Sequence, residues 1–123
     1  MKSDKELPDH LEFDGLAVVN LIRKYRFAIA ADRLTLSEAE QGVKLAKAIA
    51  EVKAIAMAGG EKALGGNAQA RERTLLIALA GDEDYEMAQS AYNSAYLRLK
   101  EDEAIAEGHQ NHLKLILSDN IEG

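Results

Sequence analysis

The sequence predicts an all-α protein, a small helical bundle whose long C-terminal helix packs antiparallel, in the manner of a coiled coil, on a helix expected from Ser37 to Ala58. Apolar residues make up 47% of the 123 residues, yet the chain has only two Phe, four Tyr and no Trp, so small side chains dominate. Small side chains suit closely packed helices better than sheets. Apolar residues also recur at helical spacing through most of the chain, and proline occurs once. We expect one helical domain over residues 13–123.

The first twelve residues predict a flexible arm. They are polar, they contain Pro8, and they lack the apolar stretch of a secretion signal. The rest of the chain has no apolar run long enough to cross a membrane, and it has no cysteine for a disulfide or a thiolate metal site. We therefore expect a cytoplasmic protein that needs no membrane, in the host cytoplasm if a phage encodes it.

Residues 16–31 are expected to form a helix, although Tyr25, Phe27 and Ile29 also alternate as in a strand. This segment interleaves Arg23, Lys24 and Arg26 with Tyr25 and Phe27. Basic side chains neutralise phosphates and aromatic rings can stack on bases, so the segment is a candidate for nucleic-acid contact. The simpler interpretation is the solvated face of an amphipathic helix, with Tyr25 turned toward the core.

A second helix is predicted from Ser37 to Ala58. Ser37 followed by Glu40 three residues later is the capping-box pattern of a helix start. Gly59 and Gly60 follow Ala58 and supply the backbone freedom that the end of a helix needs. The apolar stripe of this helix is expected at Leu45, Ala48, Ile49, Val52 and Ile55.

The stretch from Gly60 to Asn67 has two glycines at the spacing of a phosphate-binding loop. Gly66 and Asn67, however, stand where that loop needs its lysine and its hydroxyl. We therefore expect a connection between helices, with Asn67 as the N-cap of a helix that Gly81 ends. Leu75, Leu76 and Leu79 are expected to face inward. Arg71 and Arg73, near the start of this helix, could hold an anion or pair with the protein's own acids.

The last helix is predicted to be long, because residues 82–117 contain no proline and open with three acids that favour a helix start. Two sets of residues, three apart, each recur every seven residues, as in the seam of a coiled coil. Gly108 predicts a kink or break within residues 107–111. The seam comprises Tyr85, Tyr92, Leu99, Ala106 and Leu113 together with Ala88, Ala95, Asp102, His109 and Ile116.

Two of these seam residues, Asp102 and His109, are polar. Such residues face solvent, pair across the interface to fix register, or mark a site. His109 and His112 lie one helical turn apart, which is a possible pair of metal ligands, but two ligands do not complete a site. We expect no metal, no cofactor and no catalytic residues, and hence no enzyme.

Asn67, Arg71, Leu75, Leu79, Asp82, Tyr85, Tyr92, Ala95 and Leu99 stand in the order of a polar cap, spaced leucines and an Asp-x-x-Tyr helix start. In this pattern the segment 65–117 resembles a loose group of small helical proteins encoded by bacteriophages and prophages. Such proteins are often encoded among phage DNA-replication and recombination genes. The resemblance implies a viral protein with a role near DNA metabolism, and it implies no catalytic residue.

The charge distribution points to a protein partner. Residues 61–123 carry twelve acidic and six basic side chains, and the net charge of the chain is −6. We expect a homodimer that acts on a protein through an acidic surface, as an accessory to phage DNA metabolism or as an inhibitor of a host defence nuclease. The alternative is a nucleic-acid binder that uses Arg23, Lys24, Arg26, Arg71 and Arg73. The acidic surface comprises Asp82, Glu83, Asp84, Glu86, Glu101, Asp102, Glu103 and Glu107.

Overall fold

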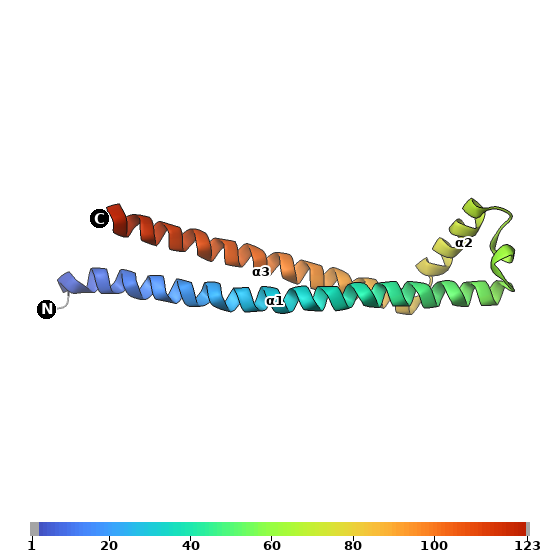
Figure 1. Ribbon diagram of the computed structural model, residues 1–123, viewed down its shortest axis with the longest axis horizontal. Helices are drawn as coiled ribbons and strands as arrows, with labels where there is room; N and C mark the ends of the chain where they lie inside the picture. The colour runs from blue at the N-terminus through green and yellow to red at the C-terminus, as the bar shows by residue number, and fades with distance from the viewer. Residues whose placement is uncertain (1–2, 123) are drawn as a thin grey trace. The chain divides into compact units, whose positions relative to one another are not determined.

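The computed structural model describes residues 3–122, with side chains placed from Gly15 to Asp119. Within this part, the chain forms three α-helices and one short 3-10 helix, and it contains no strand (Figure 1). The prediction of an all-α fold with a long C-terminal helix is confirmed. The elements are α1 (Ser3–Ala58), η1 (Glu61–Leu64), α2 (Ala68–Ala80) and α3 (Glu83–Glu122).

Helix α1 is one continuous helix, so the prediction of a new helix start at Ser37 is wrong. No glycine or proline interrupts residues 16–41, and the local capping signal does not end a helix whose apolar repeat continues through it. The ambiguity over residues 16–31 is resolved in favour of a helix. The flexible arm expected over residues 1–12 stays a prediction, since their side chains lie outside the described residues.

The chain divides into two compact units. The terminal unit joins Met1–Arg33 to Leu97–Gly123, and the central unit is Leu34–Tyr96. In the terminal unit the first part of α1 and the last part of α3 run antiparallel (Figure 1). Its core cluster contains Val18, Ile22 and Ile116, with Leu113 packed against them.

The seam predicted for α3 is the face that this helix buries, because all ten of its residues are buried or half-buried. Helix α1 carries a matching repeat, with intervals that alternate between four and three residues, and every member is likewise buried or half-buried. Helical spacing predicts the part of this repeat within residues 16–31, but it did not indicate the continuation through residues 32–50. It comprises Val18, Ile22, Tyr25, Ile29 and Asp32 in the terminal unit and Leu36, Ala39, Val43, Ala46 and Ala50 in the central unit.

The repeat of α1 explains why the stripe predicted for residues 45–55 does not face the core. Leu45 is 63% exposed and Val52 is 65% exposed, whereas Ala50 is only 4% exposed. The buried side of α1 in this region carries small alanines instead, which allow close helix packing. The inward orientation predicted for Leu76 is also wrong, since it is 58% exposed, while Leu79 is buried as predicted.

The end of α1 is a Schellman motif built on two glycines. The amide of Gly60 donates to the carbonyl of Ile55 at 3.0 Å, and the amide of Gly59 donates to Ala56 at 3.2 Å. Gly59 and Gly60 have φ values of 90° and 136°, which side-chain-bearing L residues rarely adopt. The predicted role of both glycines is confirmed, and the preceding element is a helix, unlike the strand that precedes a phosphate-binding loop.

The connection between η1 and α2 is held by capping and by a close backbone approach. Asn67 is the predicted N-cap of α2, and its Oδ1 accepts from the amide of Ala70 at 2.8 Å. A Cβ atom on Gly65 would lie 2.7 Å from the Cβ of Ala70, so this position needs glycine. Gly81 ends α2 as predicted, with its amide bonded to Ile77.

Helix α3 is one continuous helix over Glu83–Glu122, so it has no break near Gly108. Gly108 is exposed, and a Cβ atom there would meet no neighbour within 4 Å. One glycine weakens a helix by about 1 kcal/mol, which the buried seam on both sides of it offsets. Among the described helices, none has the length and apolarity that crossing a bilayer demands.

Candidate functional site

The two polar residues in the seam of α3 meet polar or aromatic residues of α1. In the terminal unit, the ring centroids of His109 and Tyr25 are 5.5 Å apart, with the rings tilted by 36°. The carboxyl group of Asp102 faces that of Asp32, within reach of a hydrogen bond when one of the two is protonated. Of the three alternatives open for such residues, the structure thus shows pairing across the seam.

Asp32 is the one charged residue buried in the described core, with 6% of its surface exposed. Its Oδ1 lies 3.5 Å from Nε of Arg98, and no donor among the described residues reaches its Oδ2. The pKa of Asp32 is raised, chiefly because its protonated form hydrogen-bonds to Asp102, and further because burial and the charge of Asp102 disfavour ionisation. Arg98 acts in the opposite sense. A proton shared between the carboxyl groups would satisfy Oδ2.

Exposed ion pairs surround this carboxyl pair. Glu103 lies 3.6 Å from Arg33 of α1 and 3.3 Å from Lys100 of α3. Pairs of this kind between solvated side chains contribute little, about 0–1 kcal/mol each. They lie at the edge of the seam. The carboxyl pair of Asp32 and Asp102 inside it favours one register of the two helices.

No group of three His, Cys, Asp or Glu side chains with metal-binding spacing occurs in the part of the chain that the structure describes. His109 is half-buried against Tyr25, whereas His112 is exposed. Asp32 and Asp102 can exchange a proton, and they sit inside a helix pair rather than in an open cleft.

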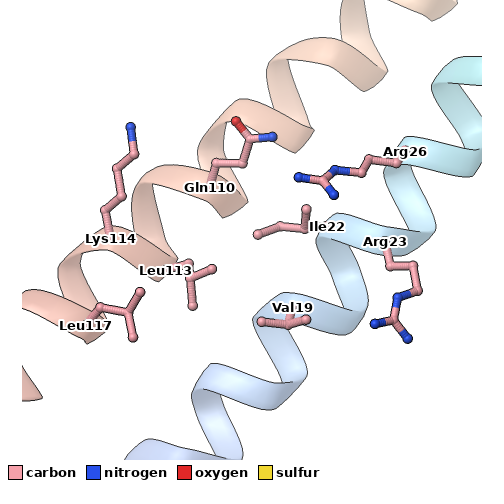
Figure 2. Close-up of a pocket in the computed structure, with 8 residues that line it drawn as sticks. All are labelled: Val19, Ile22, Arg23, Arg26, Gln110, Leu113, Lys114 and Leu117. Carbon is pink, nitrogen blue, oxygen red and sulfur yellow. The ribbon is translucent and has the colours of Figure 1, made fainter.

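Basic residues of α1 gather at a groove of the terminal unit. Arg23 and Arg26 line it together with Lys114 of α3, which the sequence did not single out (Figure 2). Lys24 lies 6.0 Å from the ring of Tyr25 and is not a lining residue. Because Tyr25 packs on His109, this ring is not free to stack on a base.

The two arginines near the start of α2 have different roles. Nε of Arg71 donates to the carbonyl of Gly65 at 3.0 Å, next to the bond from the Thr74 hydroxyl to the carbonyl of Leu64 at 2.7 Å. Arg71 therefore holds the connection between η1 and α2. Arg73 is exposed. These residues belong to the central unit, whereas Arg23, Lys24 and Arg26 belong to the terminal unit.

The eight acids of the predicted surface divide into three with contacts inside the protein and five that are exposed, and they belong to both units. Asp82 caps α3, since its Oδ1 accepts from the amide of Tyr85 at 2.8 Å, and Asp102 and Glu103 make the contacts described above. The other five are exposed. They are Glu83, Asp84 and Glu86 in the central unit, and Glu101 and Glu107 in the terminal unit.

The outward side of α1 in the central unit carries a continuous apolar face. We call it the outer stripe and define it by the exposed residues Leu45, Ala48, Ile49 and Val52 and the half-buried Ile55. Leu45, Ile49 and Val52 are spaced by four and three residues, so they lie on one side of the helix, and Ile49 is 46% exposed. In this unit α1 is therefore apolar on two sides, its buried repeat and the outer stripe. The outer stripe stays exposed and is available to a partner.

The protein therefore belongs to the class of all-α proteins that contain an antiparallel helix pair. Its particular features are the pairing of Asp32 with Asp102 and the exposed outer stripe. Comparison of the chain with known protein families, with curated proteins and with solved structures gives no match.

Proposed function

We propose that the chain is a non-enzymatic helical interaction protein that dimerises through the outer stripe and presents exposed acids to a protein partner. The observation that carries the proposal is the exposure of Leu45, Ile49 and Val52 on one side of α1. Burying large aliphatic side chains stabilises by about 1.5–3 kcal/mol each, so an exposed row of them favours association.

Charge along the outer stripe favours a second copy as its occupant. Lys44 and Glu51 are seven residues apart, and both lie on one edge of the stripe. When two copies pair antiparallel about a two-fold axis near Lys47 and Ala48, each lysine faces the glutamate of the other copy. A two-fold interface requires this kind of self-complementary pattern.

The acids at the start of α3 supply the surface for a different protein. Glu83, Asp84 and Glu86 are exposed in the central unit. An acidic surface attracts basic surfaces, including those that bind nucleic acid. With the resemblance to phage proteins in view, we propose a partner in phage DNA metabolism or a host defence nuclease.

The dimer is tested by light scattering at micromolar concentration. The test variant combines Leu45→Gln, Ile49→Gln and Val52→Gln. The control combines Leu16→Gln, Leu97→Gln and Leu115→Gln, whose leucines in the terminal unit are 61%, 65% and 65% exposed. The wild type and the control should be dimers, and the test variant should be a helical monomer by circular dichroism. A monomeric wild type would refute the dimer.

The acidic surface is tested by affinity capture from host lysate with the partners identified. Glu83→Gln, Asp84→Asn and Glu86→Gln together remove three charges, and Glu38→Gln, Glu61→Gln and Glu72→Gln remove three from exposed positions elsewhere in the same unit. A nucleic-acid-handling enzyme should be retained by the wild type and by the control but not by the first variant. Equal retention by all three proteins would contradict this role.

The nucleic-acid alternative has less support, because Tyr25 is in contact with His109 and Arg71 is bonded to Gly65. Phe27, which is 73% exposed, is the aromatic residue of this segment that remains accessible. A gel shift with single-stranded and duplex DNA at low salt tests the alternative. A shift that Arg23→Gln and Arg26→Gln abolish would support it, and no shift at low salt would exclude it.

A further inference from the structure

A groove between α1 and α3 in the terminal unit combines an aliphatic floor with basic edges. Its volume is about 380 Å³. Figure 2 shows Val19, Ile22 and Leu113 between the two helices, Arg26 and Gln110 extending toward each other, and Lys114 extending outward from α3. Arg23 and Leu117 complete the lining. The groove lies apart from both surfaces of the proposed function, because those belong to the central unit.

The charge of this groove is opposite to that of the chain. Among the lining residues whose side chains the structure describes, Arg23, Arg26 and Lys114 are basic and none is acidic, whereas the net charge of the chain is −6. The three cations attract anionic ligands to this groove, although the protein as a whole is acidic. Arginine adds planar, bidentate recognition of carboxylates.

The floor discriminates among anionic ligands. Val19, Ile22, Leu113 and Leu117 are all aliphatic, and no aromatic side chain lines the groove in the part of the chain from Gly15 to Asp119. Proteins that bind single-stranded nucleic acid stack bases on aromatic rings, which this groove does not offer. An aliphatic floor between cations instead matches a peptide in which carboxylates flank leucine-like side chains.

We propose that this groove is a docking site for an acidic peptide segment of another protein. The segment places an aliphatic side chain on Val19, Leu113 and Leu117, and its carboxylates pair with Arg23, Arg26 and Lys114. The site goes beyond the proposed function, because it binds an acidic segment where the proposed function binds a basic surface. The chain therefore has two faces of opposite charge preference.

The test uses the full-length chain and a short fluorescent peptide in which glutamates surround a pair of leucines, followed by anisotropy. Arg23→Gln, Arg26→Gln and Lys114→Gln together should weaken binding by about tenfold or more, since each ion pair contributes up to about 1 kcal/mol. Lys24→Gln, Lys53→Gln and Lys62→Gln remove the same charge outside the groove, and they should leave binding within about twofold.

A second pair of variants tests the floor. Leu117→Gln changes a lining residue that is 51% exposed, and Leu115→Gln changes a neighbour that is 65% exposed and does not line the groove. The first should weaken binding by about fivefold, and the second should not. A peptide with serines in place of the leucines should bind the wild type about as weakly as the leucine peptide binds the Leu117→Gln variant.

Three results would overturn the proposal. The first is no binding of the peptide at low salt. The second is equal loss of affinity in the groove variants and in their controls, which would indicate attraction by net charge alone. The third is tighter binding of a single-stranded oligonucleotide or of anionic phosphatidylglycerol vesicles to the same groove residues. Failure of the dimer or of the acidic surface would leave these measurements unaffected.

Discussion

Asp32 of α1 and Asp102 of α3 face each other across the seam of the terminal unit, so that a proton on one carboxyl group can bond to the other. They occupy the same repeat as the apolar contacts on either side, such as Ile22 with Ile116. An apolar pair at this position would tolerate many registers. A carboxyl pair is satisfied only when the two groups meet, so it stabilises one alignment of the helices at some cost in stability.

The stability of the protein should depend on pH through Asp32. Its folded pKa lies above the ordinary value of 3.8, so the folded state holds the proton more tightly than the unfolded state. The stabilisation is complete below pH 3.8 and is lost as the pH rises through the raised pKa. Thermal unfolding across this range should show a decline in the Asp32 contribution, obtained as the wild type minus Asp32→Asn. A contribution that grows with rising pH would contradict it.

Asp32→Asn should stabilise the protein at neutral pH. Asparagine is neutral at every pH, and its amide can donate to the carboxylate of Asp102, so the buried charge disappears while the hydrogen bond stays. We expect the free energy of unfolding to rise by about 1 kcal/mol. Chemical denaturation measures it, with Asp119→Asn as an exposed control that should have no effect. A loss of stability would show that the ion pair with Arg98 dominates.

Gly65→Ala should destabilise the central unit, because its Cβ would lie 2.7 Å from the Cβ of Ala70 and 2.8 Å from the backbone carbon. The backbone of α2 cannot move away without weakening the bonds of Arg71 and Thr74 to the same connection. The expected cost is about 1–3 kcal/mol. Gly66→Ala is the matched control, since no atom lies within 4 Å of its added Cβ. Equal behaviour of the two variants would contradict the close approach.

Gly42→Ala and Gly108→Ala should each stabilise the protein. Both glycines are exposed inside long helices, and neither Cβ would meet an atom within 4 Å. Alanine loses less conformational entropy than glycine on folding, so the free energy of unfolding should rise by about 0.5–1 kcal/mol per site. Ala91→Gly, at an exposed position of α3, should have the opposite effect. A less stable Gly108 variant would mean that α3 bends there in solution.

The signals that the sequence carried most reliably were local ones. The helix ends at Gly59, Gly60 and Gly81 and the cap at Asn67 are decided by φ preference and by one side-chain bond, both of which are encoded in neighbouring residues. The seven-residue repeat of α3 was readable because Tyr85, Tyr92, Leu99, Leu113 and Ile116 are large enough to stand out among its alanines.

The facing surface of α1 could not be read as easily. Alanines fill its seam in the central unit, while the larger Leu45, Ile49 and Val52 lie outside, so a search for large apolar residues selects the wrong side. The repeat in α1 that includes Asp32 would have identified the correct side. Which carboxylate Asp102 meets, and which cations share the groove with Lys114, depends on the pairing of two helices far apart in the sequence.

At the two glycines that follow Ala58, backbone conformation and not lack of space excludes larger residues. No atom lies within 4 Å of a Cβ added to Gly59 or Gly60, so there is space for a larger residue at both. Their φ values of 90° and 136° are nevertheless unfavourable for any L residue with a side chain. The helix therefore ends where it does because of the chirality of amino acids, and a D-alanine introduced by chemical synthesis would keep the turn that an L-alanine strains.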